Sequence, residues 1–154
     1  MPLHPTRSTP FGFWRFSAEY LLAARAVRAA HGERVLFPLL YLYGLSIELA
    51  LKAFLLRRGE SLSRVKNLSH RLTALLDLAR KRKLGREVRL AARQLTAIRT
   101  LGITYSSDQL RYIVTGVTSV PSLADLAEAA EVVVIGLEQF CTGHNVFFRR
   151  KHAG

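Results

Sequence analysis

Apolar residues recur every three or four positions along most of the chain, which is the spacing of one face of an α-helix. The pattern predicts five helical segments. They extend from about Phe16 to His31, from about Phe37 to Arg58, from an N-cap at Ser69 to a Gly85 cap, over residues 86–102, and from an N-cap at Ser122 to about Cys141. Residues 60–67 are predicted to be a loop, and residues 103–121 are predicted to be irregular.

Each segment has apolar positions that are expected to face the core. They are Phe16, Tyr20, Ala23, Ala24 and Val27 in the first segment, Leu72, Leu75, Leu76 and Ala79 in the third, Val88, Ala91, Ala92, Leu95 and Ile98 in the fourth, and Leu123, Leu126, Ala130, Val134, Leu137 and Cys141 in the fifth. A short strand at the β-branched run 132–135 is the alternative to helix there. The pattern predicts an all-α, single-domain, up-and-down bundle of four to five helices, centred on the second segment. The bundle is expected over residues 14–148, between an N-terminal lead (1–13) and a basic tail (149–154).

The most apolar stretch, residues 35–56, is long enough to cross a membrane. Glu48 and Lys52 would then lie in the hydrocarbon, at a cost of about 2.5–3.5 kcal/mol each. We therefore expect a buried helix in a cytoplasmic protein without a membrane contact. The one cysteine, Cys141, excludes an intramolecular disulfide and is expected to be a packed thiol. The five histidines lack zinc-finger spacing, so neither a metal nor a cofactor is predicted.

Positive charge is concentrated in one third of the chain. The formal net charge is +12, and residues 57–99 hold thirteen basic side chains against three acidic ones. The predicted basic surface consists of Arg80, Lys81, Arg82, Lys83, Arg86, Arg89 and Arg93. Arg86, Arg89 and Arg93 are expected to line one side of the fourth helix. Such a surface attracts nucleic acid through its phosphates, and the alternatives are an acidic protein partner or a solvated face without a ligand.

Glu48 and Lys52 are one helical turn apart, with the glutamate N-terminal to the lysine. In one interpretation the pair lies at the edge of the bundle and Lys52 extends its ammonium into water. In the other it forms a polar site in a groove, where Glu48 needs a second donor from His70, Arg111 or Tyr112. The residues alone favour the first interpretation and leave the second open.

The motifs "SIELALKAFLLRRG", "NLSHRLTALLDLA" and "LRYIV" together resemble the HEPN superfamily of small helical proteins, over roughly residues 40–112. The chain departs from the family pattern at Ser69 and Arg71, where the family often has Gly and Asp around the histidine. The resemblance implies a four- or five-helix bundle, frequently a homodimer, that binds nucleotides or RNA. It makes Glu48 and Lys52 a feature of the central helix. Several members are toxins that a small nucleotidyltransferase partner neutralises.

Some members of that superfamily are metal-independent ribonucleases with an Arg and a His that are separated by four to six intervening residues. A histidine can move the 2′-hydroxyl proton while an arginine stabilises the phosphorane charge. Arg64 with His70, and Arg25 with His31, have this spacing, although the family's nucleases place the motif on a late helix. The leading hypothesis is a binding or assembly module for nucleic acid or nucleotide. The alternatives are a ribonuclease toxin that uses Arg64 and His70, or a protein-binding component of a toxin–antitoxin-like pair. Whether the protein is an enzyme stays open.

Overall fold

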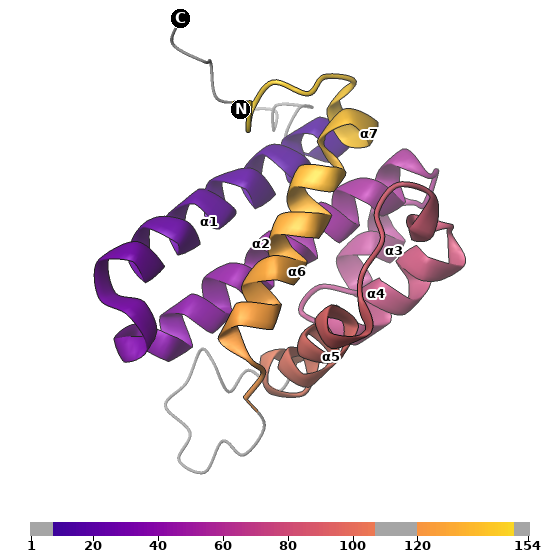
Figure 1. The fold of residues 1–154 in the computed structure, drawn as a ribbon. Helices are drawn as coiled ribbons and strands as arrows, with labels where there is room; N and C mark the ends of the chain where they lie inside the picture. Colours follow the sequence, from indigo (N-terminus) through magenta and orange to yellow (C-terminus); the bar gives the residue numbers. More distant parts are fainter. Residues whose placement is uncertain (1–7, 107–119, 150–154) are drawn as a thin grey trace, which may run out of the picture.

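The computed structural model describes residues 8–106 and 120–149, and this part of the chain is a bundle of helices without a strand (Figure 1). The elements are α1 (Pro10–His31), the 3₁₀ turn η2 (Gly32–Val35), α2 (Leu36–Arg57), α3 (Leu62–Asn67), α4 (Leu72–Lys81), the 3₁₀ turn η3 (Leu84–Arg86), α5 (Ala92–Ser106), α6 (Leu123–Gly136) and α7 (Glu138–Thr142). The predicted all-α bundle is confirmed. Its five longer helices are α1, α2, α4, α5 and α6.

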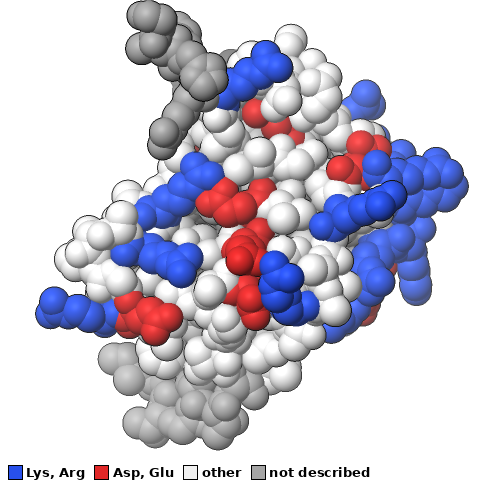
Figure 2. Space-filling model, viewed as in Figure 1, with Lys and Arg blue, Asp and Glu red and all other residues white. Residues whose placement is uncertain are grey.

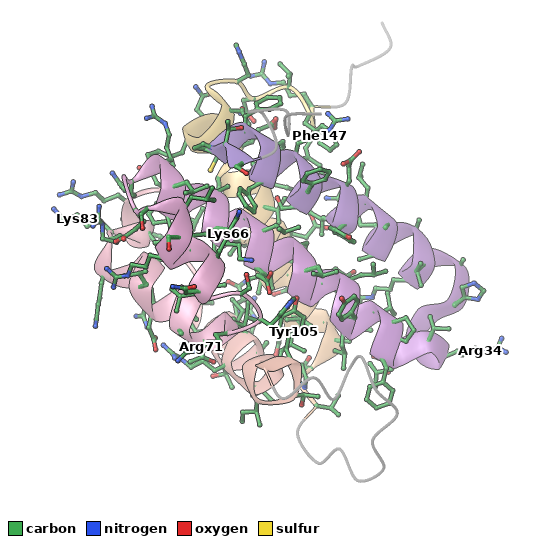
Figure 3. All side chains as sticks on the ribbon, turned by 180° about the vertical axis from the view of Figure 1, so that it is seen from behind. Arg34, Lys66, Arg71, Lys83, Tyr105 and Phe147 are labelled. Carbon is green, nitrogen blue, oxygen red and sulfur yellow. The ribbon has the colours of Figure 1, made fainter. Side chains whose placement is uncertain are left out.

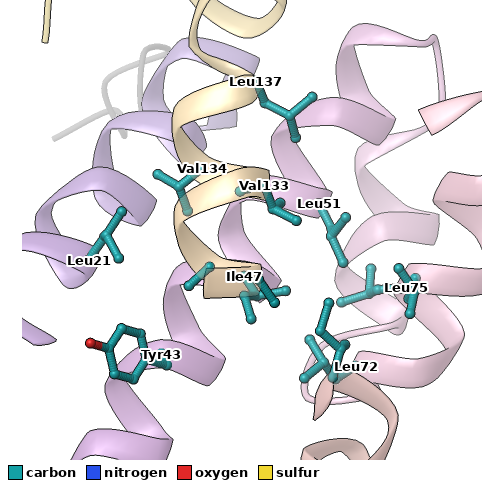
Figure 4. Close-up of a cluster of buried hydrophobic side chains, with 14 of the residues drawn as sticks. Leu21, Tyr43, Ile47, Leu51, Leu72, Leu75, Val133, Val134 and Leu137 are labelled. Atoms are coloured by element: carbon teal, nitrogen blue, oxygen red, sulfur yellow. The ribbon is translucent and has the colours of Figure 1, made fainter. Parts of the chain in front are cut away.

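Helix α2 is the centre of the bundle and contacts α1, α4, α5, α6 and α7. Figure 4 shows Ile47 and Leu51 of α2 with Leu72 and Leu75 of α4 on one side and Val133 of α6 on the other. Full burial of each such side chain contributes about 1.5–3 kcal/mol relative to exposure. Helix α2 is buried on most of its faces because its sequence is apolar almost all round, as the composition of residues 35–56 predicts.

One helical stretch, Pro10–Arg57, is apolar and long enough to cross a membrane by length and composition. Its most apolar window is 72% buried inside the bundle. That window therefore lies mostly inside the fold, among the helices that surround α2 (Figure 1).

The apolar positions predicted for the third and fifth segments are confirmed, because every one of them is buried, in α4, in α6, in α7 or at Leu137 between α6 and α7. The Ser122 N-cap is also confirmed, since its Oγ accepts a hydrogen bond from the amide of Asp125 at 3.3 Å. Residues 132–135 are helical, so the strand alternative is wrong. The extra short helix α3 lies in the predicted loop, where Ser61 Oγ caps it by accepting from the amide of Arg64.

The predicted buried face of the first helix is wrong in part, because Ala24 is buried and Val27 packs against the core, whereas Phe16 and Ala23 are exposed. Phe16 is 43% exposed, and the face that packs instead includes Trp14, Ala18 and Leu21. Trp14 decides the orientation, because its indole N–H donates to the carbonyl of Val134 at 2.7 Å and its ring needs a buried site. The helix also begins earlier than predicted, at Pro10, with Thr9 as its N-cap.

The predicted fourth helix begins six residues too early. Helix α5 starts at Ala92, so Arg86 and Arg89 precede it and do not line it with Arg93. The chain turns here because Val88 packs directly on Gly136 of α6, where any side chain would collide with it. The predicted Gly85 cap is wrong too, because the left-handed residue after α4 is Lys83, at φ +67°.

Two further boundaries differ. Ser69 is not the N-cap of α4, which begins at Leu72 after Arg71. Residues 103–106 of the predicted irregular segment continue α5, residues 107–119 lie outside the described residues, and residues 120–121 are irregular as predicted.

The end of the described chain folds back onto α1. The buried Glu138 accepts hydrogen bonds from the amides of Val146 and Phe147, at 3.2 and 2.8 Å, on Oε2. The ring of Phe147 then meets Trp14 edge to face, with 5.6 Å between the ring centroids. Nearby, Cys141 is a packed thiol, and burial raises its pKa to about 12.

Candidate functional site

Glu48 and Lys52 are both buried in the interior of the bundle. Lys52 Nζ donates to Glu48 Oε2 at 2.9 Å, and the two side chains are only 7% and 3% exposed for Lys52 and Glu48. Lys52 Nζ also donates to Ser69 Oγ at 2.8 Å. Lys52 therefore does not extend into water, and the interpretation as a pair at the bundle edge is wrong. Ser69, predicted as a cap, is instead the second partner of the ammonium.

His70 supplies the second donor that Glu48 needs. Its backbone amide donates to Glu48 Oε1 at 2.9 Å, and its Nδ1 lies 3.2 Å from the same oxygen. Arg111 and Tyr112, the other two candidates, lie outside the described residues. We call Glu48, Lys52, Ser69 and His70 the buried polar cluster.

The buried polar cluster fixes the turn between α3 and α4. His70 has φ +62°, a left-handed conformation that a residue with a side chain adopts at a cost. The hydrogen bond that the His70 amide donates to Glu48, together with the contact between Nδ1 and the same carboxylate oxygen, holds it there. Both oxygens of the buried carboxylate are engaged, so the charge is compensated on each side.

His70 has substantial access to solvent, since its side chain is 36% exposed. A carboxylate against Nδ1 fixes the orientation of an imidazole, and a proton-transfer histidine needs such an orientation. The ring of Tyr105 lies beside it, with 5.9 Å between the ring centroids. The imidazole of His70 is therefore held in one orientation by Glu48 and can be reached from solvent.

The two predicted Arg–His pairs have different surroundings. Arg64 lies on α3, where its side chain is 60% exposed and its Nη1 is 3.5 Å from Glu60 Oε2. His70 lies instead against Glu48. Arg25 forms a two-pronged ion pair with Glu131 of α6, and His31 is exposed at the end of α1.

On one face of the molecule the acidic side chains lie in the middle, with basic side chains on both sides of them (Figure 2). Figure 2 shows acidic side chains along the middle, over α6, and basic side chains gathered at the right edge, over the region of α3 and α4 in Figure 1. The acidic residues of α6 include Glu128, which pairs with Arg93. That hydrogen bond raises the pKa of Arg93 and lowers the pKa of Glu128. The charge of Arg93 is thus paired with a carboxylate, and Arg93 lies apart from the rest of the predicted basic surface.

The basic side chains enclose an open recess of about 380 Å³ where the end of α2 meets the turn from α4 to η3. Its lining consists of Arg58, Lys81, Arg82, Lys83 and Arg86. We call it the basic recess. Arg80 and Arg89 line a neighbouring hollow with apolar residues of the same turn. Arg58 was not among the predicted surface residues, although its place at the end of the second helix was evident.

Two arginines form the rigid part of the basic recess. Arg82 Nη2 donates to the carbonyl oxygen of Arg58 at 2.6 Å, and its Nη1 donates to Glu60 Oε1 at 3.0 Å. Arg58 Nη2 in turn reaches Glu87 Oε1 at 3.3 Å and the carbonyl oxygen of Lys83 at 3.5 Å. The two guanidinium groups therefore tie the end of α2 to the turn after α4.

The other three cations of the recess, Lys81, Lys83 and Arg86, are exposed, and none has a carboxylate within 4.0 Å in the described part of the chain. Figure 3 shows Lys83 at the outer edge of the molecule, pointing away from the fold. These three side chains are positioned to meet an anion from solvent.

Residues 8–106 and 120–149 contain no group of three His, Cys, Asp or Glu side chains that could hold a metal ion. The chain matches no protein-family model, no curated protein and no solved structure. The resemblance to the HEPN superfamily therefore stays a prediction. The two features of the structure that bear on function are the buried polar cluster and the basic recess.

Proposed function

We propose that the protein is a HEPN-like binding module that binds nucleic acid, RNA in the first instance, through the basic recess. One observation carries the proposal: five cationic side chains line a single recess, and three of them lack a carboxylate partner in the described part of the chain. The homodimer and the nucleotidyltransferase-type protein partner that the resemblance implies stay predictions.

Phosphate groups suit this recess for two physical reasons. Each lysine or arginine that neutralises a phosphate releases a condensed counterion, which drives binding at low salt. The guanidinium groups of Arg58 and Arg82 are held in place before any ligand arrives, so little side-chain entropy is lost there on binding.

The buried polar cluster supports the recess in this proposal. It joins α2 to the turn that precedes α4, and the far end of α4 carries Lys81 and Arg82. The charged pair inside the bundle is thus part of the scaffold that positions the charged residues outside it.

The test is the binding of a labelled single-stranded RNA, measured by fluorescence anisotropy. The recess variant is Lys81→Gln/Lys83→Asn/Arg86→Gln, where asparagine is chosen because it tolerates the left-handed conformation at Lys83. At about 0.1 M salt, three lost phosphate contacts weaken binding by up to about 100-fold.

A control variant removes the same charge elsewhere, with Arg28→Gln/Arg34→Gln/Arg149→Gln. Figure 3 places Arg34 and Lys83 at opposite ends of the molecule. The control is expected to bind RNA far better than the recess variant. Equal losses in the two variants would contradict a local site. Polyglutamate that competes as strongly as RNA of equal charge would favour an acidic protein partner.

A metal-independent ribonuclease is the second candidate, favoured by the contact between Glu48 Oε1 and His70 Nδ1. The assay is labelled RNA on a denaturing gel in the presence of EDTA, with the wild type beside His70→Ala. Cleavage that the variant loses would make the protein a ribonuclease. A binding module leaves RNA intact in both lanes.

A further inference from the structure

We propose that the basic recess recognises a terminal phosphate, the phosphomonoester at an end of an RNA strand, in preference to the phosphodiesters inside the strand. This inference rests on the proposed function and names the chemical group that the recess would select. It follows from the charge, the donors and the shape of the recess.

The charge of the recess matches a dianion. Of its five cations, Arg82 is paired with Glu60 and Arg58 with Glu87, and the remaining three have no such partner in the described residues. A phosphomonoester carries about −1.5 to −2 charge near neutral pH, whereas a phosphodiester carries a single charge. A terminal phosphate therefore neutralises more of the excess positive charge than a phosphodiester does.

Several backbone carbonyls around the recess already have donors. The end of a helix normally presents unpaired carbonyl oxygens, which repel negative charge. Here the carbonyl of Arg58 accepts from Arg82 at 2.6 Å, and the carbonyl of Lys83 accepts from the amide of Arg86 at 3.1 Å. The carbonyls of Leu78 and Arg80 are engaged in the same way by backbone amides.

Arg58 keeps its place in the recess, but its present hydrogen bonds are weak enough for a phosphate oxygen to replace them. Its hydrogen bonds to Glu87 and to the carbonyl of Lys83 are long, at 3.3 and 3.5 Å, and bonds of this length are weak. Its Nε has no hydrogen-bond partner among the described residues. A phosphate oxygen would give this guanidinium a stronger, charge-assisted partner.

The shape of the recess favours a chain end. A terminal phosphate presents three unesterified oxygens, which cations on several sides of a hollow can contact together. A phosphodiester has two such oxygens, and its strand must enter and leave the hollow. The five side chains that surround this recess come from α2, α4 and the turn that follows it, so they approach from more than one side.

The experiment compares three RNAs of one short sequence, each with a fluorophore on an internal base. One has a 5′-phosphate, one has a 3′-phosphate and one has hydroxyls at both ends, so the first two distinguish the sources of the terminal phosphate. Wild type is expected to bind one phosphorylated RNA about tenfold more tightly than the unphosphorylated one, because the terminal phosphate accepts additional charge-assisted hydrogen bonds from the cations of the recess. Inorganic phosphate should compete better than chloride at equal ionic strength.

Two triple variants locate the preference. Lys81→Gln/Lys83→Asn/Arg86→Gln should bind the three RNAs equally. The matched variant Arg71→Gln/Arg80→Gln/Arg89→Gln removes the same charge from exposed positions outside the recess, and it should bind all three less tightly while it keeps the preference. A preference that survives in the recess variant would overturn the inference. Equal, salt-sensitive binding of the three RNAs by wild type would overturn it and leave the proposed function standing. Absence of binding at low salt would overturn both.

Discussion

The buried polar cluster and the basic recess use the same kinds of side chain in opposite ways. In the cluster, the carboxylate of Glu48 and the ammonium of Lys52 each have two hydrogen-bonding partners, and water hardly reaches them. In the recess, cations outnumber the carboxylates that pair with them, and the unpaired ones face solvent. A charge in the interior must be fully compensated by the protein, because the medium around it cannot solvate it.

The contrast separates structural charges from charges that are available to a ligand. In the buried polar cluster, loss of one charged partner leaves the other buried without compensation, so the expected effect is on the stability of the fold. Outside, water replaces the lost side chain, so the expected effect is on binding. Four predictions follow this contrast, ordered from the largest effect to the smallest.

The largest effect is expected for Glu48→Gln. The substitution leaves the Lys52 ammonium buried without a counter-charge and should lower the free energy of unfolding by about 3–5 kcal/mol. Denaturant unfolding followed by circular dichroism measures it. Asp77→Asn removes an exposed partner of Arg99 and should change the same quantity by less than about 1 kcal/mol. Similar losses in the two variants would mean that burial does not distinguish the two pairs.

The recess variant Lys81→Gln/Lys83→Asn/Arg86→Gln should show the reverse pattern. The slope of log Kd against log salt for single-stranded RNA should decrease by about 2, since each phosphate contact contributes about 0.7. Its free energy of unfolding should stay within about 0.5 kcal/mol of wild type for each surface substitution. An unchanged slope with a lowered stability would show that these cations are structural.

Cys141 gives a prediction for pH. Burial raises its pKa from 9.0 to about 12, so the neutral thiol is favoured in the folded state. Below the unfolded pKa this contribution is fully present, and it is lost as pH rises from about 9 toward 12, at about 1.4 kcal/mol per pH unit. Unfolding curves of wild type and Cys141→Ala at increasing pH measure the difference, which isolates the thiol from the tyrosines and lysines. A constant difference across that range would contradict a buried thiol.

The smallest effect is expected at His70, where backbone and side chain can be separated. The left-handed conformation costs about 1–2 kcal/mol for a residue with a Cβ and almost nothing for glycine. His70→Gly should therefore be more stable than His70→Ala by about 1 kcal/mol in denaturant unfolding, although both lose the ring contact with Glu48 and keep the backbone amide. If the two variants were equally stable, the turn would have another conformation in solution.

The sequence was sufficient for the parts of the fold that local spacing determines. The stripe of α4, the Ser122 cap and the central place of α2 all follow from residues within a few positions of one another. The buried face of α1 does not, because Trp14 is oriented by Val134, far away in the sequence. The break before α5 likewise depends on the contact of Val88 with Gly136.

The candidate site, too, could be predicted from the sequence only where local spacing determines it. Glu48 and Lys52 are one turn apart on a helix, so their pairing was predictable, as was the concentration of cations in one third of the chain. The partners from the next turn, Ser69 and His70, lie 17 and 22 positions from Lys52 and Glu48, and only the fold brings them together. The basic recess also depends on Arg58, which meets the later cations through tertiary contacts.

Hydrogen exchange of the full chain with and without single-stranded RNA tests the central claim most directly. It locates the contact without any substitution. Binding at the basic recess predicts slower exchange of amides in the turn from α4 through η3, residues 80–89, and little change along the acidic face of α6. Protection along α6 or α1 instead, or no protection at RNA concentrations that saturate binding, would contradict the proposal that this recess is where nucleic acid binds.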